Sequence, residues 1–293
     1  MDYIIFSNKN DLQEGMYGQT LTWLLEILHD LEKTNKINDT SRIMFDVNAL
    51  QYNNIIPTFI IAKNEYTMND LKNPVLLNIK PYKSSKTLDF DFDMNSFQVA
   101  NRIWNKYFVL SQGIEDNIPK IDSENTLGVH FRGTDKTSDA NEANPISQDE
   151  FIIIVKDYLS NHKEIQTIYC CSDEASFITR MKAEFNHLNI IDYDQKRATD
   201  NSRAFHKNIP NDNKAQHTCA AIVDMIALSR CKTVLKTSSA MSAFSKIINP
   251  NVQLLTCCAM KQRWFPTGVV DVYLSSDIKV NNILKRTMVG HNY

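Results

Sequence analysis

Polar residues follow three predicted strands in the second half of the chain. They form the runs HFRGTDK (residues 130–136), SDE (172–174) and KTSS (236–239). In open parallel α/β sheets, ligands bind at the carboxyl ends of the strands. Because these ends meet at one edge of a sheet, the sequence predicts a single polar site built from three loops.

Arg132 lies just past a buried strand, where an unpaired guanidinium is costly. Its planar fork of five donors suits a diphosphate. The alternative is an internal ion pair with Asp135 or Asp173. Gly133, the next residue, allows a ligand or another backbone to approach closely.

The run Thr237, Ser238 and Ser239 precedes a predicted helix. Free N–H groups at a helix N-terminus, together with hydroxyls, form an anion site. The alternative is ordinary N-capping. The position after a central strand favours the anion site.

Asp224 and His130 each have two interpretations. Asp224 falls within the predicted helix His217 to Arg230, where its carboxylate could accept hydrogen bonds from guanine N1 and N2 or simply be a solvated charge. His130, at a strand end, is either a ligand-binding side chain or a satisfied core residue.

Two further segments each have a functional and a purely structural interpretation. Residues 15–19 (GMYGQ) place two glycines between the first strand and the first helix, as a loop near phosphates or as a tight turn. The acidic and polar run 138–142 (SDANE) supplies a catalytic base or is merely solvated.

The elements that must position these residues alternate between strands and helices. Continuous apolar strands between amphipathic helices indicate an α/β protein with a doubly wound parallel sheet. The polar stretch 111–125 indicates a linker, which gives domains at 1–118 and 119–293. The predicted strands are Tyr3 to Phe6, Arg42 to Val47, Thr126 to Phe131, Gln166 to Cys171, Leu188 to Ile191, Thr233 to Leu235 and Val252 to Leu255. The predicted helices are Gln19 to Lys33, Ser96 to Leu110, Ser147 to Ser160, Glu174 to Phe185, His217 to Arg230 and Ala240 to Ile248.

Composition excludes several classes of protein. The 293 residues suggest about two domains. With 32 Lys+Arg against 34 Asp+Glu, nothing favours nonspecific nucleic-acid binding. Only 7 glycines are present, and neither G-x-G-x-x-G nor G-x-x-x-x-G-K-[ST] occurs. A bound nucleotide would therefore have its phosphates held by other means.

The N-terminal residues, the length of the apolar stretches and the cysteine pattern bear on the expected location of the protein. The N-terminus MDYIIFSNKND lacks a basic region and a long apolar run, and no stretch is long enough for an integral membrane segment. A cytoplasmic protein is expected. None of the six cysteines forms a C-x-x-C pair, so reduced, buried thiols are expected rather than a zinc site.

Taken together, these segments resemble the fucosyltransferase superfamily. Residues 128–136 (GVHFRGTDK) resemble its H-x-R-R-x-D motif, most nearly in the α1,6-fucosyltransferase branch that includes a bacterial nodulation enzyme. Residues 172–174 resemble the second motif. Asp224, with the strand and the serine-rich turn 237–239 that follow it, is similar to the third. Residues 15–19 resemble a G-x-G-x-Q loop that is one residue longer here.

The resemblance implies a GT-B-like fold, with two Rossmann-like domains facing a cleft. The C-terminal domain would bind the nucleotide sugar, and the N-terminal domain would help to bind the acceptor. Arg132 would hold the diphosphate, and Asp224 and His130 would contact guanine. The implied donor-binding residues are His130, Arg132, Gly18, Asp173, Asp224, Thr237, Ser238 and Ser239.

The resemblance also implies an activity. It is inverting, metal-independent transfer of fucose from GDP-fucose to a hydroxyl of a glycan or glycoconjugate, with no cofactor besides the donor substrate. Arg132 can stabilise the leaving diphosphate in place of a metal ion. Direct displacement requires a base. The family's acid aligns with Ala140, so the neighbouring Asp139 is the predicted base.

Two departures from the family pattern leave alternatives open. Gly133 stands where the motif has a second arginine, which removes one positive charge, although protein O-fucosyltransferases also keep a single arginine there. The serine-rich turn lacks an aromatic residue. The alternatives are a glycosyltransferase that uses another nucleotide sugar, an inactive nucleotide-sugar-binding protein, and an unrelated α/β protein.

Overall fold

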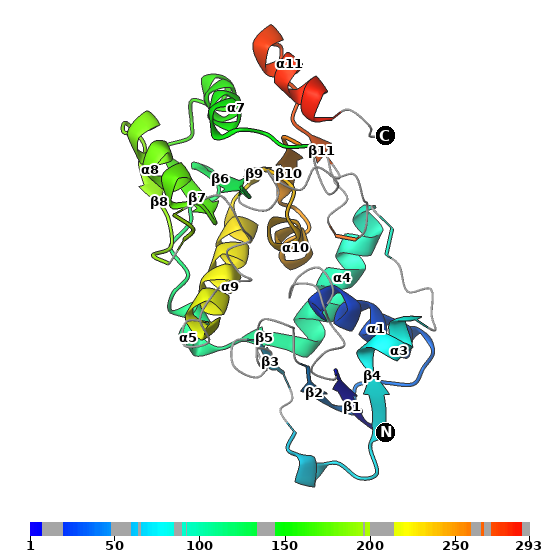
Figure 1. Cartoon of the computed structure of the whole chain (residues 1–293). Helices are drawn as coiled ribbons and strands as arrows, with labels where there is room; N and C mark the ends of the chain where they lie inside the picture. Colours follow the sequence, from blue (N-terminus) through cyan, green and yellow to red (C-terminus); the bar gives the residue numbers. More distant parts are fainter. Residues whose placement is uncertain are drawn as a thin grey trace.

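The computed structural model describes residues 1–7, 20–47, 60–63, 66–84, 90–91, 93–133, 144–195, 197–199, 214–258, 265–266 and 271–288. In these residues the chain forms a three-stranded and a six-stranded parallel sheet and one two-stranded antiparallel pair (Figure 1). The predicted α/β class with two parallel-sheet units is confirmed.

The first unit is built around a sheet of order β2-β1-β4, in which both neighbours run parallel to β1. The leucines of the first helix form the buried stripe that the sequence predicted, because they recur at helical spacing. Its elements are β1 Asp2–Phe6, α1 Thr22–Lys33, β2 Arg42–Asp46, β3 Ile60–Ala62, η2 Met68–Asp70, β4 Val75–Asn78, α3 Ile79–Ser84, α4 Met94–Tyr107, β5 Phe108–Leu110 and α5 Gln112–Glu115.

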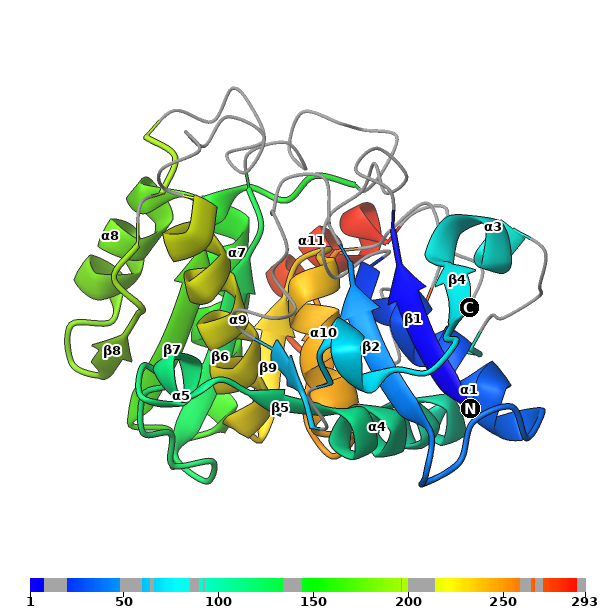
Figure 2. The ribbon, with the colours of Figure 1, turned by 90° about the horizontal axis from the view of Figure 1, so that it is seen from below.

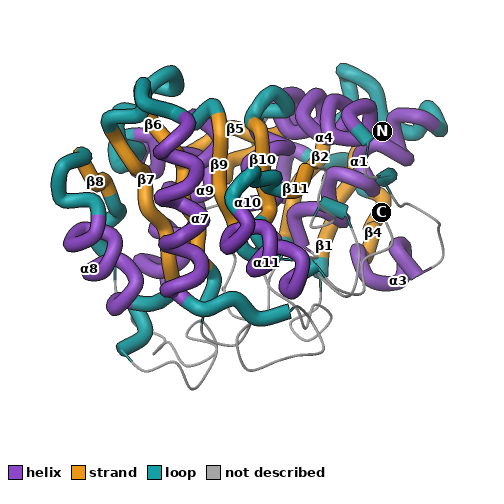
Figure 3. The backbone as a smooth tube through the Cα atoms, turned by 90° about the horizontal axis from the view of Figure 1, so that it is seen from above, coloured by secondary structure: helices purple, strands orange, loops and turns teal. Residues whose placement is uncertain are grey.

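The second unit is a parallel sheet of order β11-β10-β9-β6-β7-β8. Figure 3 shows α7 and α8 in front of its strands. Its elements are β6 Thr126–Phe131, α7 Gln148–Asn161, β7 Thr167–Ser172, α8 Ala175–Glu184, β8 Asn189–Ile191, α9 Lys214–Arg230, β9 Thr233–Lys236, α10 Ala240–Ile248, β10 Gln253–Thr256, β11 Asp271–Val272 and α11 Ile278–Thr287.

The six-stranded sheet is covered on both faces, as a doubly wound sheet requires. Successive residues of a strand point to opposite faces. On β6, Val129 and Phe131 belong to a core shared with α7, α8 and α11. Gly128 faces α9 instead, since a Cβ there would meet the side chains of Leu228 and Cys231.

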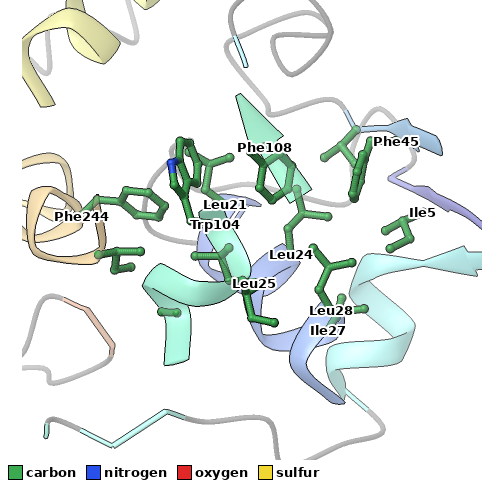
Figure 4. Close-up of a cluster of buried hydrophobic side chains, with 14 of the residues drawn as sticks. Ile5, Leu21, Leu24, Leu25, Ile27, Leu28, Phe45, Trp104, Phe108 and Phe244 are labelled. Carbon is green, nitrogen blue, oxygen red and sulfur yellow. The ribbon is translucent and has the colours of Figure 1, made fainter. Parts of the chain in front are cut away.

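A common core joins the two units. Ile222 and Ile226 of α9 and Phe244 of α10 belong to the same buried cluster as Leu24 and Trp104 of the first unit. Figure 2 shows α10 between the two sheets, and Figure 4 shows Phe244 beside Trp104. The boundary between 118 and 119 stays a prediction.

The structure differs in detail from the sequence-based prediction between the two sheets. The helix predicted through Leu110 ends at Tyr107, because Phe108–Leu110 pair as β5 with β3. The predicted linker 111–125 contains the helix α5, and Ile114 in it is fully buried. All six cysteines are free thiols, as expected. Among the described helices, none has the length and apolar character to cross a membrane.

Candidate functional site

The polar loops lie where the strand order of the larger sheet reverses. Counted from β6, the order is 3-2-1-4-5-6, which is that of dinucleotide-binding sheets. β6 and β9 are neighbours but successive connections leave them in opposite directions. The crevice outside their carboxyl ends is the expected ligand position in this topology.

Hydrogen bonds fasten the end of β6 to the end of β9. The backbone N–H of Arg132 donates to Thr237 Oγ1 at 2.7 Å, and the N–H of Thr237 donates to the carbonyl of His130 at 3.0 Å. Thr237 is almost fully buried. Its hydroxyl therefore holds the position of the Arg132 backbone, a role that differs from the predicted contact with a phosphate.

Asp173, after β7, holds both the side chain and the backbone of the HFRGTDK loop. Its Oδ2 lies 3.0 Å from Arg132 Nη1, and its Oδ1 accepts the N–H of Gly133 at 3.0 Å. Both side chains are largely buried, at 18% and 8% exposure. The internal ion pair weighed as an alternative thus exists, and it positions Arg132 at the sheet edge.

Gly133 is required by its neighbour Glu174. A Cβ at position 133 would lie 2.0 Å from Glu174 Oε1. Glu174 is only 1% exposed, and Gln148 Nε2 donates to its Oε2 at 2.6 Å. A second arginine in the motif would therefore need the space that this carboxylate fills.

His130 is buried on the α9 side of the sheet, two residues after Gly128. Its Nδ1 has no hydrogen-bond partner within the described part of the chain. Burial, followed by the charges of Lys236 and Arg132, lowers the pKa of His130 to about 3. The imidazole is therefore neutral at pH 7.

Lys236, which sequence reasoning assigned no role, lies directly across from His130 on β9. It is 2% exposed, and burial lowers the pKa of its ammonium to about 8. The available signal was a lysine that ends an apolar strand beside a serine-rich turn.

Ser238 and Ser239 lead into the N-terminus of α10. The Ser238 N–H donates to Cys258 Sγ at 3.2 Å, whereas its buried Oγ has no partner. Ser239 occupies the N-cap position, but its side chain makes no capping bond. The N-capping alternative is thus not observed, and the Ser239 side chain leaves the first N–H groups of α10 without a cap.

His217, near the start of α9, is a second residue that sequence reasoning missed. Burial and the Arg132 charge lower its pKa to about 4, and Asp173 acts in the opposite direction. His217 therefore lies within electrostatic range of the Arg132–Asp173 pair. A histidine near the start of a helix gives no sequence signal that separates it from a surface residue.

Asp224 does not join the cluster at the strand ends. Its oxygens accept Tyr169 Oη at 2.7 Å and Gln195 Nε2 at 2.9 Å, and burial raises its pKa to about 6. Tyr169 pairs with Gly128, two residues before His130. Asp224 is thus deeper against the sheet and 3% exposed, so it is not the solvated charge considered as an alternative.

Two predicted residues, Gly18 and Asp139, lie outside the described residues. Within the residues that are described, no group of three or more His, Cys, Asp or Glu side chains is arranged to hold a metal ion. The structure thus brings together His130, Arg132, Asp173 and Thr237, with Ser238 and Ser239 at the adjoining helix start.

Comparison with known proteins adds several distant similarities. No family model matches the chain. No curated protein matches it either. Fucosyltransferase NodZ from Bradyrhizobium is similar in structure, with a TM-score of 0.49, 11% identity and coverage of 86% of this chain and 94% of NodZ. A NodZ α-1,6-fucosyltransferase structure soaked with GDP-fucose has a TM-score of 0.45 and 11% identity, covering 85% and 94%.

A mutant of Arabidopsis thaliana FUT1 in complex with GDP is also similar in structure. Its TM-score is 0.49 at 9% identity, covering 90% of this chain and 71% of FUT1. These proteins are fucosyltransferases, the superfamily that the sequence motifs resemble. Similarities at such scores and identities do not establish a function for this chain.

Proposed function

We propose that this chain is a glycosyltransferase that moves fucose from GDP-fucose to a hydroxyl of a glycan or glycoconjugate, with inversion and without a metal. One observation carries the proposal. Arg132, His130 and the uncapped start of α10 converge at the reversal point of a 3-2-1-4-5-6 sheet. Such a point suits the phosphates of a nucleotide.

The proposed chemistry is a single displacement. The acceptor oxygen attacks the anomeric carbon, the bond from that carbon to the diphosphate oxygen breaks, and a base takes the hydroxyl proton. Arg132 stabilises the charge that develops on the leaving diphosphate, with Asp173 fixing its orientation. Asp139 is the proposed base, and Gly18 the proposed approach from the first unit.

We propose that Asp224 recognises guanine by accepting its hydrogen bonds. A carboxylate that accepts two donors suits guanine N1 and N2. In this structure the amide of Gln195 donates to Asp224 Oδ2 at 2.9 Å. The nucleobase would therefore take the place of Gln195, and the Tyr169 hydroxyl would remain on Oδ1.

A thermal-shift comparison of nucleotides tests the donor. GDP is expected to raise the melting temperature of the protein, and Arg132→Ala is expected to remove most of that shift, because it deletes a charged partner of the diphosphate. Arg230→Ala, an exposed arginine at the end of α9, is the matched control and is expected to keep the shift. Stabilisation by UDP but not GDP would reject the fucosyl donor.

An inactive nucleotide-sugar-binding protein is the second candidate. The buried Glu174 carboxylate at the place of a second arginine favours it, because it leaves the site one cation short. Turnover of GDP-fucose with a glycan acceptor in the presence of EDTA separates the two candidates. Binding without any turnover would favour the inactive protein, and turnover only with added metal would refute the role of Arg132.

A further inference from the structure

Lys236 is a buried cation that has no counter-charge among the residues that the structure describes. It ends β9 at the reversal point and is 2% exposed. In the part of the chain that the structure describes, no carboxylate pairs with its ammonium, and only the thiols of Cys257 and Cys258 favour its charge. Burying an unpaired charge costs several kcal/mol, so proteins pair such groups or use them.

The side chains around Lys236 also lack partners. His130 lies beside it across the β6–β9 pair, and its buried Nδ1 has no hydrogen-bond partner. Ser238 Oγ is buried without one as well. The Ser238 N–H donates to Cys258 Sγ at 3.2 Å, and the same thiol acts electrostatically on Lys236, so both residues neighbour Cys258.

The charges that act on His130 are positive. Lys236 and Arg132 both lie close enough to His130 to lower its pKa. The start of α10 adds the partial positive charge of a helix N-terminus. Asp173 pairs with Arg132, and burial raises the pKa of the Cys257 and Cys258 thiols, which therefore stay neutral. Among the described residues, the Lys236 ammonium has no paired carboxylate of its own, although the buried Glu174 carboxylate lies against Gly133 in the neighbouring loop.

Lys246 shows how this chain satisfies a buried lysine that has a structural role. It is 4% exposed, yet its Nζ donates to the carbonyl of Val252 at 2.8 Å and lies 5.9 Å from the ring centroid of Phe97. Lys236 has no comparable arrangement. A purely structural role therefore explains Lys246 but not Lys236.

We propose that Lys236 is the second cation of an anion site at the β6–β9 reversal point, where it binds the diphosphate of the donor together with Arg132. In naming the donor, this inference rests on the proposed function. When the bond to the sugar breaks, the electron pair stays on the diphosphate, and the ammonium stabilises that charge. The anion site itself requires only a phosphate group.

The test compares Lys236→Met with Lys246→Met, using inorganic pyrophosphate and GDP as probes. Lys236→Met should raise the melting temperature of the unliganded protein, because an unpaired buried charge is removed. It should weaken both probes about tenfold to hundredfold by calorimetry, as expected for one charged hydrogen bond. Lys246→Met should lower the melting temperature and keep both dissociation constants within about twofold.

Several outcomes would overturn the inference. Unchanged pyrophosphate and GDP binding in Lys236→Met would do so, as would a fall in its melting temperature like that of Lys246→Met. Should Lys236→Met not fold, Lys236→Gln, which is polar but uncharged, gives the same comparison of affinities.

The two probes separate this inference from the proposed donor. Lys236-dependent binding of pyrophosphate without binding of GDP would support the anion site and reject the donor. Equal binding of GDP by wild type and Lys236→Met would support the donor and reject the role of Lys236. A wild-type protein that binds neither probe would reject both.

Discussion

The Glu174 carboxylate occupies the space that a side chain at position 133 would need. A side chain at 133 must displace a buried carboxylate that Gln148 holds at 2.6 Å. Gly133→Ala should therefore destabilise the protein by about 1–3 kcal/mol. In a Glu174→Ala background the same change should cost less than about 0.5 kcal/mol, because the clash is absent. Urea unfolding of the four proteins gives both costs, and equal costs would contradict the steric explanation.

At the level of single residues, the sequence predicted which side chains lie at the strand ends better than it predicted their burial and their partners. The rule that ligands gather at strand ends found Arg132, Asp173 and Thr237, and the structure joins them by hydrogen bonds. It could not show that Asp224 faces Tyr169 inside the protein, because position within a helix does not specify the face until the packing is known. The sequence assigned no role to Lys236, because the burial of a lysine side chain cannot be predicted from its residue type.

Among the helices and strands, some with strong local sequence signals have the first and last residues that the sequence predicted. β6 and α10 have the predicted bounds, and Ser147 and Glu150 form a capping box at the start of α7. Elements that depend on a partner were missed. Within the described residues, β11 has two residues and pairs with β10. The short helix α3 has Pro81 as its third residue, where a helix needs no N–H partner.

The capping box predicts a measurable loss. Ser147→Ala removes the side-chain acceptor of the Glu150 N–H at the start of α7. The expected cost is about 1 kcal/mol in unfolding free energy. Ser160→Ala, near the other end of the same helix, removes only a bond to the carbonyl of Asp157 and should cost less than about 0.5 kcal/mol. Equal losses in chemical denaturation would show that capping does not stabilise α7.

On the scale of the whole molecule, the two sheets depend on one core. Phe244 of α10 is fully buried and its ring centroid lies 5.6 Å from that of Trp104 on α4. The two Asn101 Nδ2 hydrogen bonds to the carbonyls of Ile247 and Ile248, at 2.9 and 2.8 Å, fasten the same helices. The sequence predicted the two sheets but not this contact, because residues about 140 positions apart in the chain carry no mutual signal.

This shared core predicts cooperative unfolding. Phe244→Ala should cost about 3–5 kcal/mol, and tryptophan fluorescence and far-UV circular dichroism should still report one common transition. Leu274→Ala, at a side chain that is 82% exposed, is the control and should change stability by less than about 0.5 kcal/mol. Separate transitions for the two signals in the wild type would contradict a single cooperative unit.

The two ends of helix α10 contact different parts of the molecule. Its first residues face the proposed anion site, and its last carbonyls accept hydrogen bonds from Asn101 of the first unit. A helix of 9 residues is about 13 Å long and behaves as a rigid body. Any coupling between the two ends is reciprocal. By whatever factor the packing of the first unit alters nucleotide affinity, a bound nucleotide alters that packing by the same factor.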